Sequence, residues 1–106
     1  MAPGLAAAFL PDSLAQIDVP VAIVAGAADQ DVPIKSNAEY FAATIPRAEL
    51  TILPAPVGHM EFTGICLEAG RTDLPAVCSD APGVDRAAVE AQTADLATAF
   101  FARRLR

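Results

Sequence analysis

Hydrophobic and polar positions divide the chain into stretches of different period. A run of apolar, largely β-branched residues predicts a strand at about 19–26, and its lack of polar positions is typical of a strand covered on both faces in an α/β protein. After a polar turn, apolar residues recur at three- and four-residue spacing, which predicts a helix at about 34–45 that ends before Pro46. A second apolar run predicts a strand at about 48–54.

Strand, helix and strand follow one another within about 35 residues, as in a β-α-β unit, so the two strands are predicted to be parallel with a right-handed crossover. The segment 55–84 is interrupted by prolines and glycines and predicts a long loop, which is usually functional or carries short helices. A final helix is predicted at about 86–104. Asp85 suits its N-cap, and Val84 and Val89 are spaced as a hydrophobic staple. The predicted fold class is therefore α/β.

Composition and charge narrow the function classes. With 106 residues the chain is long enough for one small domain, and its 54% hydrophobic and 19% charged residues exclude a disordered chain. The 24 alanines absorb only part of this apolar surplus, which is large for a small domain. No apolar stretch approaches the ~20 residues that a bilayer core requires. The net charge of −6 predicts no binding to nucleic acid or to anionic membranes.

The only histidine and a nearby aspartate carry the candidate chemistry. His59 follows the second predicted strand, and Asp29 follows the first. The ends of neighbouring parallel strands lie ~4.8 Å apart at one edge of the sheet, so the carboxylate and the imidazole come within reach of each other. Such a pair can serve as an oriented general base. Spacing alone does not choose between Asp29 and Asp31, and a lone histidine after a strand is also common as a surface residue.

These positions resemble motifs of the α/β-hydrolase family. Residues 26–33, GAADQDVP, resemble the G-x-x-D-x-x-V-P segment that carries the acid of the catalytic triad, and Gly58-His59 resembles the family's Gly-His segment. The passage 58–86 is similar to a branch of predicted dienelactone-hydrolase-like proteins. The resemblance implies that residues 1–106 form the C-terminal portion of an α/β-hydrolase domain, a partial α/β-hydrolase fold. It also implies that Asp29 is the acid and His59 the base.

The nucleophile of such a triad is missing from the sequence. Nucleophile elbows need G-x-S-x-G or G-x-C-x-G, and no two glycines here stand four apart. Ser13 is the only serine before the acid and lacks flanking glycines. The resemblance thus implies a hydrolase of carboxylic esters or lactones whose Ser or Cys nucleophile lies outside this chain, and predicts that the chain alone is inactive. It implies no cofactor and no metal.

The alternative is a non-catalytic remnant or interaction module. A strand with an unpaired edge is a template for pairing with another chain. The predicted partner is accordingly either the missing N-terminal part of the domain or a second copy bound through the sheet edge. In the first case the intact site would also take a small ester or lactone.

Two cysteines lie in the long loop. Cys66 and Cys78 are too far apart for a C-x-x-C motif, and with a single histidine they predict no zinc site. Their spacing allows either a disulfide that closes the loop or two unrelated thiols. The resembling branch looks exported and often carries such a pair, so the resemblance favours a Cys66–Cys78 disulfide. That bond would in turn favour an exported or periplasmic location.

Overall fold

The computed structural model describes residues 5–105. Two parallel strands lie at its centre, β1 (Val21–Gly26) and β2 (Ala48–Leu53), paired in register from Val21 opposite Ala48 to Gly26 opposite Leu53. The predicted parallel β-α-β unit and the α/β class are confirmed. Both strands are slightly shorter than expected, since β1 begins at Val21, after Pro20, and β2 ends at Leu53, before Pro54.

The helix expected at about 34–45 is in fact two pieces. A 3₁₀ turn, η2 (Ile34–Ser36), is followed by α2 (Ala38–Thr44), and Asn37 separates them with φ −130° and ψ −83°. The buried Asn37 side chain accepts a hydrogen bond from the Ala6 N–H (3.3 Å) and donates one to the Pro33 carbonyl (3.0 Å). Asparagine side chains compete in this way with regular backbone hydrogen bonds. The expectation of one continuous helix is therefore wrong.

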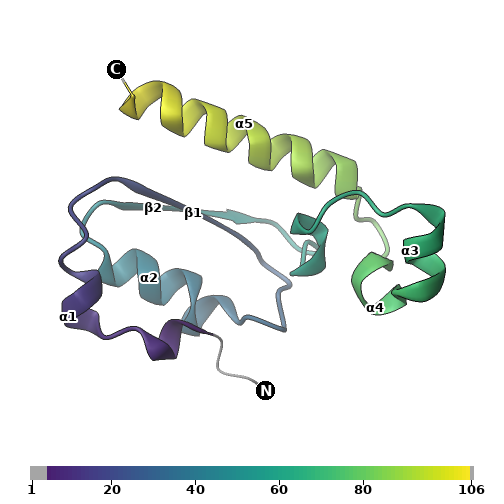
Figure 1. Ribbon diagram of the computed structural model, residues 1–106, viewed down its shortest axis with the longest axis horizontal. Coiled ribbons are helices and arrows are strands. Elements are labelled where there is room, and N and C mark those ends of the chain that lie inside the picture. The colour runs from purple at the N-terminus through teal and green to yellow at the C-terminus, as the bar shows by residue number, and fades with distance from the viewer. Residues whose placement is uncertain (1–4, 106) are drawn as a thin grey trace.

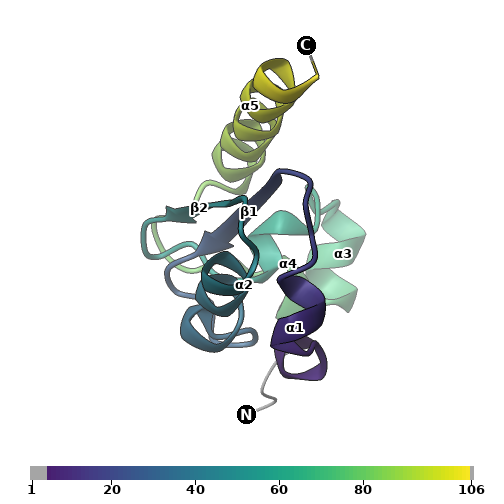
Figure 2. The same ribbon diagram turned by 90° about the vertical axis from the view of Figure 1, so that its left-hand side faces the viewer.

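Helices cover both faces of the small sheet (Figure 1). On one side lies α2, accompanied by α1 (Pro11–Leu14), which the sequence patterns did not predict. On the other side α5 (Arg86–Arg104) crosses above the strands, as Figure 2 shows from the end of the molecule. A further 3₁₀ turn, η1 (Leu5–Ala8), precedes α1. No helix within residues 5–105 is long and apolar enough to span a bilayer.

The C-terminal helix has the predicted bounds and start. The Asp85 side chain accepts a hydrogen bond from the Ala88 N–H at 3.2 Å, which satisfies one of the free N–H groups of the first turn. Val89 belongs to the buried core with Leu53 and Val57, and Val84 packs against this cluster. The side chains expected to form the staple thus lie at one apolar cluster between α5 and the sheet.

The long loop expected at 55–84 carries three short helices. These are η3 (Met60–Phe62), α3 (Glu68–Asp73) and α4 (Pro75–Cys78). With their connections, α3 and α4 form a separate projection beyond the carboxyl ends of the strands (Figure 1). We call residues 64–85 the disulfide lobe.

Candidate functional site

Gly26 brings the two loops of the candidate site together. It ends β1, and a Cβ atom at this position would lie only 2.5 Å from the carbonyl oxygens of both Val57 and Gly58. The Ala28 N–H donates a hydrogen bond to the Val57 carbonyl at 2.8 Å. The turn after β1 and the turn after β2 are therefore in direct backbone contact, which only glycine permits at this point.

Asp29 is held from two sides. Its Oδ1 accepts hydrogen bonds from the backbone N–H groups of Asp31 (3.0 Å) and Val32 (2.7 Å), and its Oδ2 lies 2.8 Å from Nδ1 of His59. The Asp29 side chain is only 8% exposed, whereas that of His59 is 39% exposed. The carboxylate is thus fixed while the imidazole keeps one side open to solvent.

The structure decides which aspartate meets the histidine. Asp29 contacts His59, whereas Asp31 contributes its backbone N–H to the Asp29 carboxylate. In the neutral tautomer whose Nδ1 donates to Asp29, Nε2 is the ring nitrogen that can accept a proton. Sequence reasoning placed both residues at one sheet edge, and the structure brings them into hydrogen-bonding contact. Their catalytic role stays a prediction.

Glu61 supports the histidine turn and was not singled out from the sequence. It is 5% exposed, and its Oε2 accepts a hydrogen bond from the Gly58 N–H at 3.1 Å. A carboxylate that reaches back to a backbone N–H at the start of a short helix resembles half of a capping box. The spacing from Gly58 to Glu61 at the start of η3 is the signal that could have found it.

A hollow of about 410 Å³ lies beside His59, and we call it the His59 hollow. The turn after β1 contributes Gln30 and Asp31 to its lining, and the turn after β2 contributes His59, Met60 and Glu61. The disulfide lobe closes another side with Ala76, Ser79 and Ala81. The β-α-β unit thus supplies the Asp29–His59 pair, and the lobe supplies part of the wall beside it.

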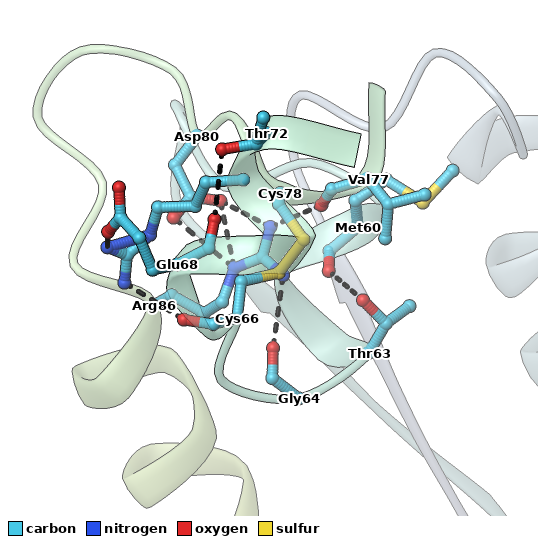
Figure 3. The surroundings of a disulfide bond; sticks show 11 residues. Met60, Thr63, Gly64, Cys66, Glu68, Thr72, Val77, Cys78, Asp80 and Arg86 are labelled. Atoms are coloured by element: carbon cyan, nitrogen blue, oxygen red, sulfur yellow. Dashed lines mark hydrogen bonds and ion pairs between the residues drawn. A yellow bond between two sulfur atoms is a disulfide. The ribbon is translucent and has the colours of Figure 1, made fainter. Parts of the chain in front are cut away.

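The expected disulfide is present between Cys66 and Cys78, with an S–S distance of 2.00 Å. It closes the lobe around the side chain of Arg86, which reaches in from the start of α5 (Figure 3). None of the lobe's own side chains is buried. The covalent bond therefore restrains a segment that has little apolar core of its own.

Arg86 is the second residue that sequence reasoning missed. It is 6% exposed, and its guanidinium donates to the Asp80 carboxylate (2.6 Å and 2.9 Å) and to the carbonyls of Val77 (2.6 Å) and Gly64 (3.1 Å). A cation in the first turn of a helix opposes the helix dipole, so it needs a specific partner. That unfavourable position was the available signal.

None of the three serines, all within residues 5–105, stands directly after a strand as a nucleophile elbow requires; Ser36, for example, lies in η2. Ser13 lies in α1, next to α2 on the opposite side of the sheet from α5 (Figure 1). Ser79 lines the His59 hollow but follows α4 in the exposed lobe. Within residues 5–105, no three His, Cys, Asp or Glu side chains are grouped so that they could hold a metal ion.

Models of protein families, curated proteins and solved structures were compared with the chain, and none matches it. The geometry of the site and the motif resemblance are therefore the grounds for assigning a function.

Proposed function

We propose that this chain supplies the acid and the base of a hydrolase of carboxylic esters or lactones, as the C-terminal part of an α/β-hydrolase domain. The supporting observation is the 2.8 Å contact between Asp29 Oδ2 and His59 Nδ1, at the carboxyl edge of a parallel sheet. Ligand sites of open α/β sheets form at this edge. The Ser or Cys nucleophile lies on a polypeptide segment outside this chain.

Each residue has a defined part in the proposed reaction. Asp29, fixed by the N–H groups of Asp31 and Val32, orients the His59 ring and stabilises its cation. Nε2 of His59 takes the proton of the attacking hydroxyl or thiol as the new bond to the acyl carbon forms. It then gives that proton to the departing alkoxide, and a water molecule repeats the cycle to release the carboxylic acid.

The chain by itself is expected to lack esterase activity, because it carries no nucleophile elbow. We expect the purified chain to hydrolyse p-nitrophenyl acetate no faster than free imidazole does at the same concentration, so that His59→Ala removes only this background. Activity in the parent that exceeds the background and is lost on His59→Ala would overturn this expectation. The Ser79→Ala variant would then show whether the serine lining the hollow is responsible.

The genomic DNA immediately upstream of the Met1 codon tests the proposal directly. We expect an in-frame G-x-S-x-G or G-x-C-x-G, and an extended protein that hydrolyses p-nitrophenyl esters. His59→Ala and Asp29→Asn should each lower kcat at least about 10²-fold. Asp95→Asn is the matched control, because Asp95 is exposed on α5 and does not line the hollow. An extended enzyme that is unaffected by His59→Ala would refute the assignment.

We also propose a second candidate function, self-association through the free edge of β1. The N–H groups of Val21 and Ala27 donate to the carbonyls of Arg47 and Leu53, on the side of β2, so those of Ala22 and Val24, which alternate with them, point away from β2. This edge borders a groove of about 390 Å³ beneath α5, lined largely by apolar residues that include Val21, Ile23, Val24, Leu96 and Phe100. Two such edges can pair antiparallel about a two-fold axis.

Sedimentation velocity distinguishes this candidate from the first. Self-association predicts a dimer of the parent at micromolar concentration and a monomer of Ala22→Pro. Proline at this position removes an outward N–H and leaves the β1–β2 ladder intact. A folded parent that remains monomeric at these concentrations would exclude self-association.

A further inference from the structure

The charges around the His59 hollow indicate which ligands it can take. Two of its lining residues, Asp31 and Glu61, carry carboxyl groups, and none is a lysine or arginine. Asp29 adds a third carboxyl group, 2.8 Å from the His59 ring. A negative group entering this space would meet several like charges and no counter-ion in the part of the wall that the structure describes.

The cations of the adjoining lobe do not offset these charges. Arg86 is buried and paired with Asp80 at 2.6 Å, so this pair is neutral as a whole. Arg71 donates to the Cys66 carbonyl at 2.9 Å. Both guanidinium groups are thus engaged within the lobe, and neither lines the hollow.

We propose that the His59 hollow selects neutral or cationic substrates and disfavours those that carry a carboxylate next to the reacting carbonyl. This inference rests on the proposed function for its reaction, but the charge preference belongs to residues of this chain. Like charges a few ångströms apart at a protein surface change relative rates by several fold at low ionic strength. The hollow therefore sets a substrate class, neutral or cationic esters, within the proposed activity.

Alkylation of His59 measures this preference without a nucleophile from elsewhere. Nε2 displaces bromide from either bromoacetamide, which is neutral, or bromoacetate, which is anionic. His59 is the only histidine of the chain, and both cysteines are in the disulfide. Mass spectrometry of the peptide that contains His59 gives the two rates. The reference is the same rate ratio for N-acetylhistidine methylamide.

We expect the bromoacetamide-to-bromoacetate ratio to exceed the reference about three- to tenfold at low salt, and to fall towards it in 0.5 M NaCl. Asp31→Asn and Glu61→Gln should each lower the ratio; glutamine retains an oxygen that can accept the Gly58 N–H. Asp95→Asn, which removes an equal charge from an exposed position on α5 outside the hollow, should leave it unchanged.

Two results would overturn the proposal. One is a ratio equal to or below the reference. The other is a raised ratio that Asp95→Asn lowers as much as Asp31→Asn does, because the preference would then come from the net charge of the chain. Neither result bears on whether an extended protein needs His59 for ester hydrolysis, so failure of the charge preference and failure of the proposed function can be told apart.

Discussion

The β-α-β unit and the disulfide lobe both border the candidate site, but different forces hold them. In the unit, strands β1 and β2 share a regular ladder, and Leu53 packs with Val57 and Val89 in the apolar core. In the lobe no side chain is buried, and a disulfide and the Arg86 hydrogen bonds take the place of a core. The difference implies that the Asp29–His59 pair and the wall beside it have separate stabilities.

The largest effect is expected at the junction of the two turns. Gly26→Ala would place a methyl group 2.5 Å from two backbone carbonyl oxygens, so the turn after β2 must move away. We expect a loss of about 3 kcal/mol or more in the free energy of unfolding, measured by urea denaturation. If the variant remains folded, the NMR signal of the His59 Nδ1–H proton should disappear, because the hydrogen bond to Asp29 that protects this proton is broken.

Gly70→Ala is the matched control in the lobe. Its added methyl group would meet only the Cys78 sulfur, at 3.3 Å, and alanine favours a helix over glycine. We expect a change below about 1 kcal/mol. An equal loss in the free energy of unfolding from both substitutions would show that the unit and the lobe are packed equally tightly at these two glycines.

Arg86→Met should weaken the lobe and spare the sheet. It leaves the Asp80 carboxylate and the carbonyls of Gly64 and Val77 without their donor, which costs about 2 to 3 kcal/mol because Arg86 is buried while Asp80 stays partly exposed. Hydrogen exchange should show this loss at the amides of α3 and α4, with β1 and β2 unchanged. Arg86→Lys keeps the charge and should lose less. If the amides of β1 and β2 lost as much protection from exchange as those of α3 and α4, the unit and the lobe would not have separate stabilities.

Reduction of the disulfide should act in the same region with a somewhat smaller effect. Opening the Cys66–Cys78 loop lowers the free energy of unfolding by at most roughly 3 kcal/mol, because the unfolded chain gains entropy. The Arg86 contacts still restrain the loop after reduction. In the Cys66→Ser/Cys78→Ser variant we expect faster exchange in α3 and α4, while the Asp29–His59 contact is retained. Loss of the His59 Nδ1–H signal in this variant would show that the pair depends on the lobe.

Sequence patterns predict the unit well because its strands are continuous apolar runs bounded by turn residues. The strands, the start of α5 at Asp85 and the parallel pairing all follow from apolar spacing and capping chemistry. The break at Asn37 does not, because it depends on a side-chain contact with Ala6, far away in sequence. The short helices of the lobe have no buried face, so no periodic spacing of apolar residues could predict them.

The candidate site divides in the same way. The ends of adjacent parallel strands place Asp29 and His59 at one edge, which spacing alone could anticipate. The choice of Asp29 over Asp31, in contrast, depends on backbone N–H groups that fold around one carboxylate. Glu61 and Arg86 leave only weak local signals in the sequence, the spacing of Glu61 from Gly58 and a cation in the first turn of α5, because they bond backbone atoms or a side chain outside any regular pattern.

The smallest effect is expected where α5 meets β2 at the surface. Glu49 is bonded by Arg104 and by Arg103 (3.0 Å), and the hydrogen bond from Arg104 is the main cause that holds the pKa of Glu49 below its usual value. Because the pKa of Glu49 is lower in the folded state than in the unfolded state, its ionised carboxylate stabilises the fold at a pH above the unfolded-state pKa. This stabilisation is lost as the pH falls through the folded-state pKa. An NMR titration of Glu49 should give a midpoint below 4.5, and Arg104→Gln should raise that midpoint.

High salt should also raise the midpoint of Glu49, since its contact with the arginines is exposed. An unchanged midpoint in Arg104→Gln would show that the end of α5 is not tied to β2, leaving the apolar cluster around Val89 to hold the helix on the sheet.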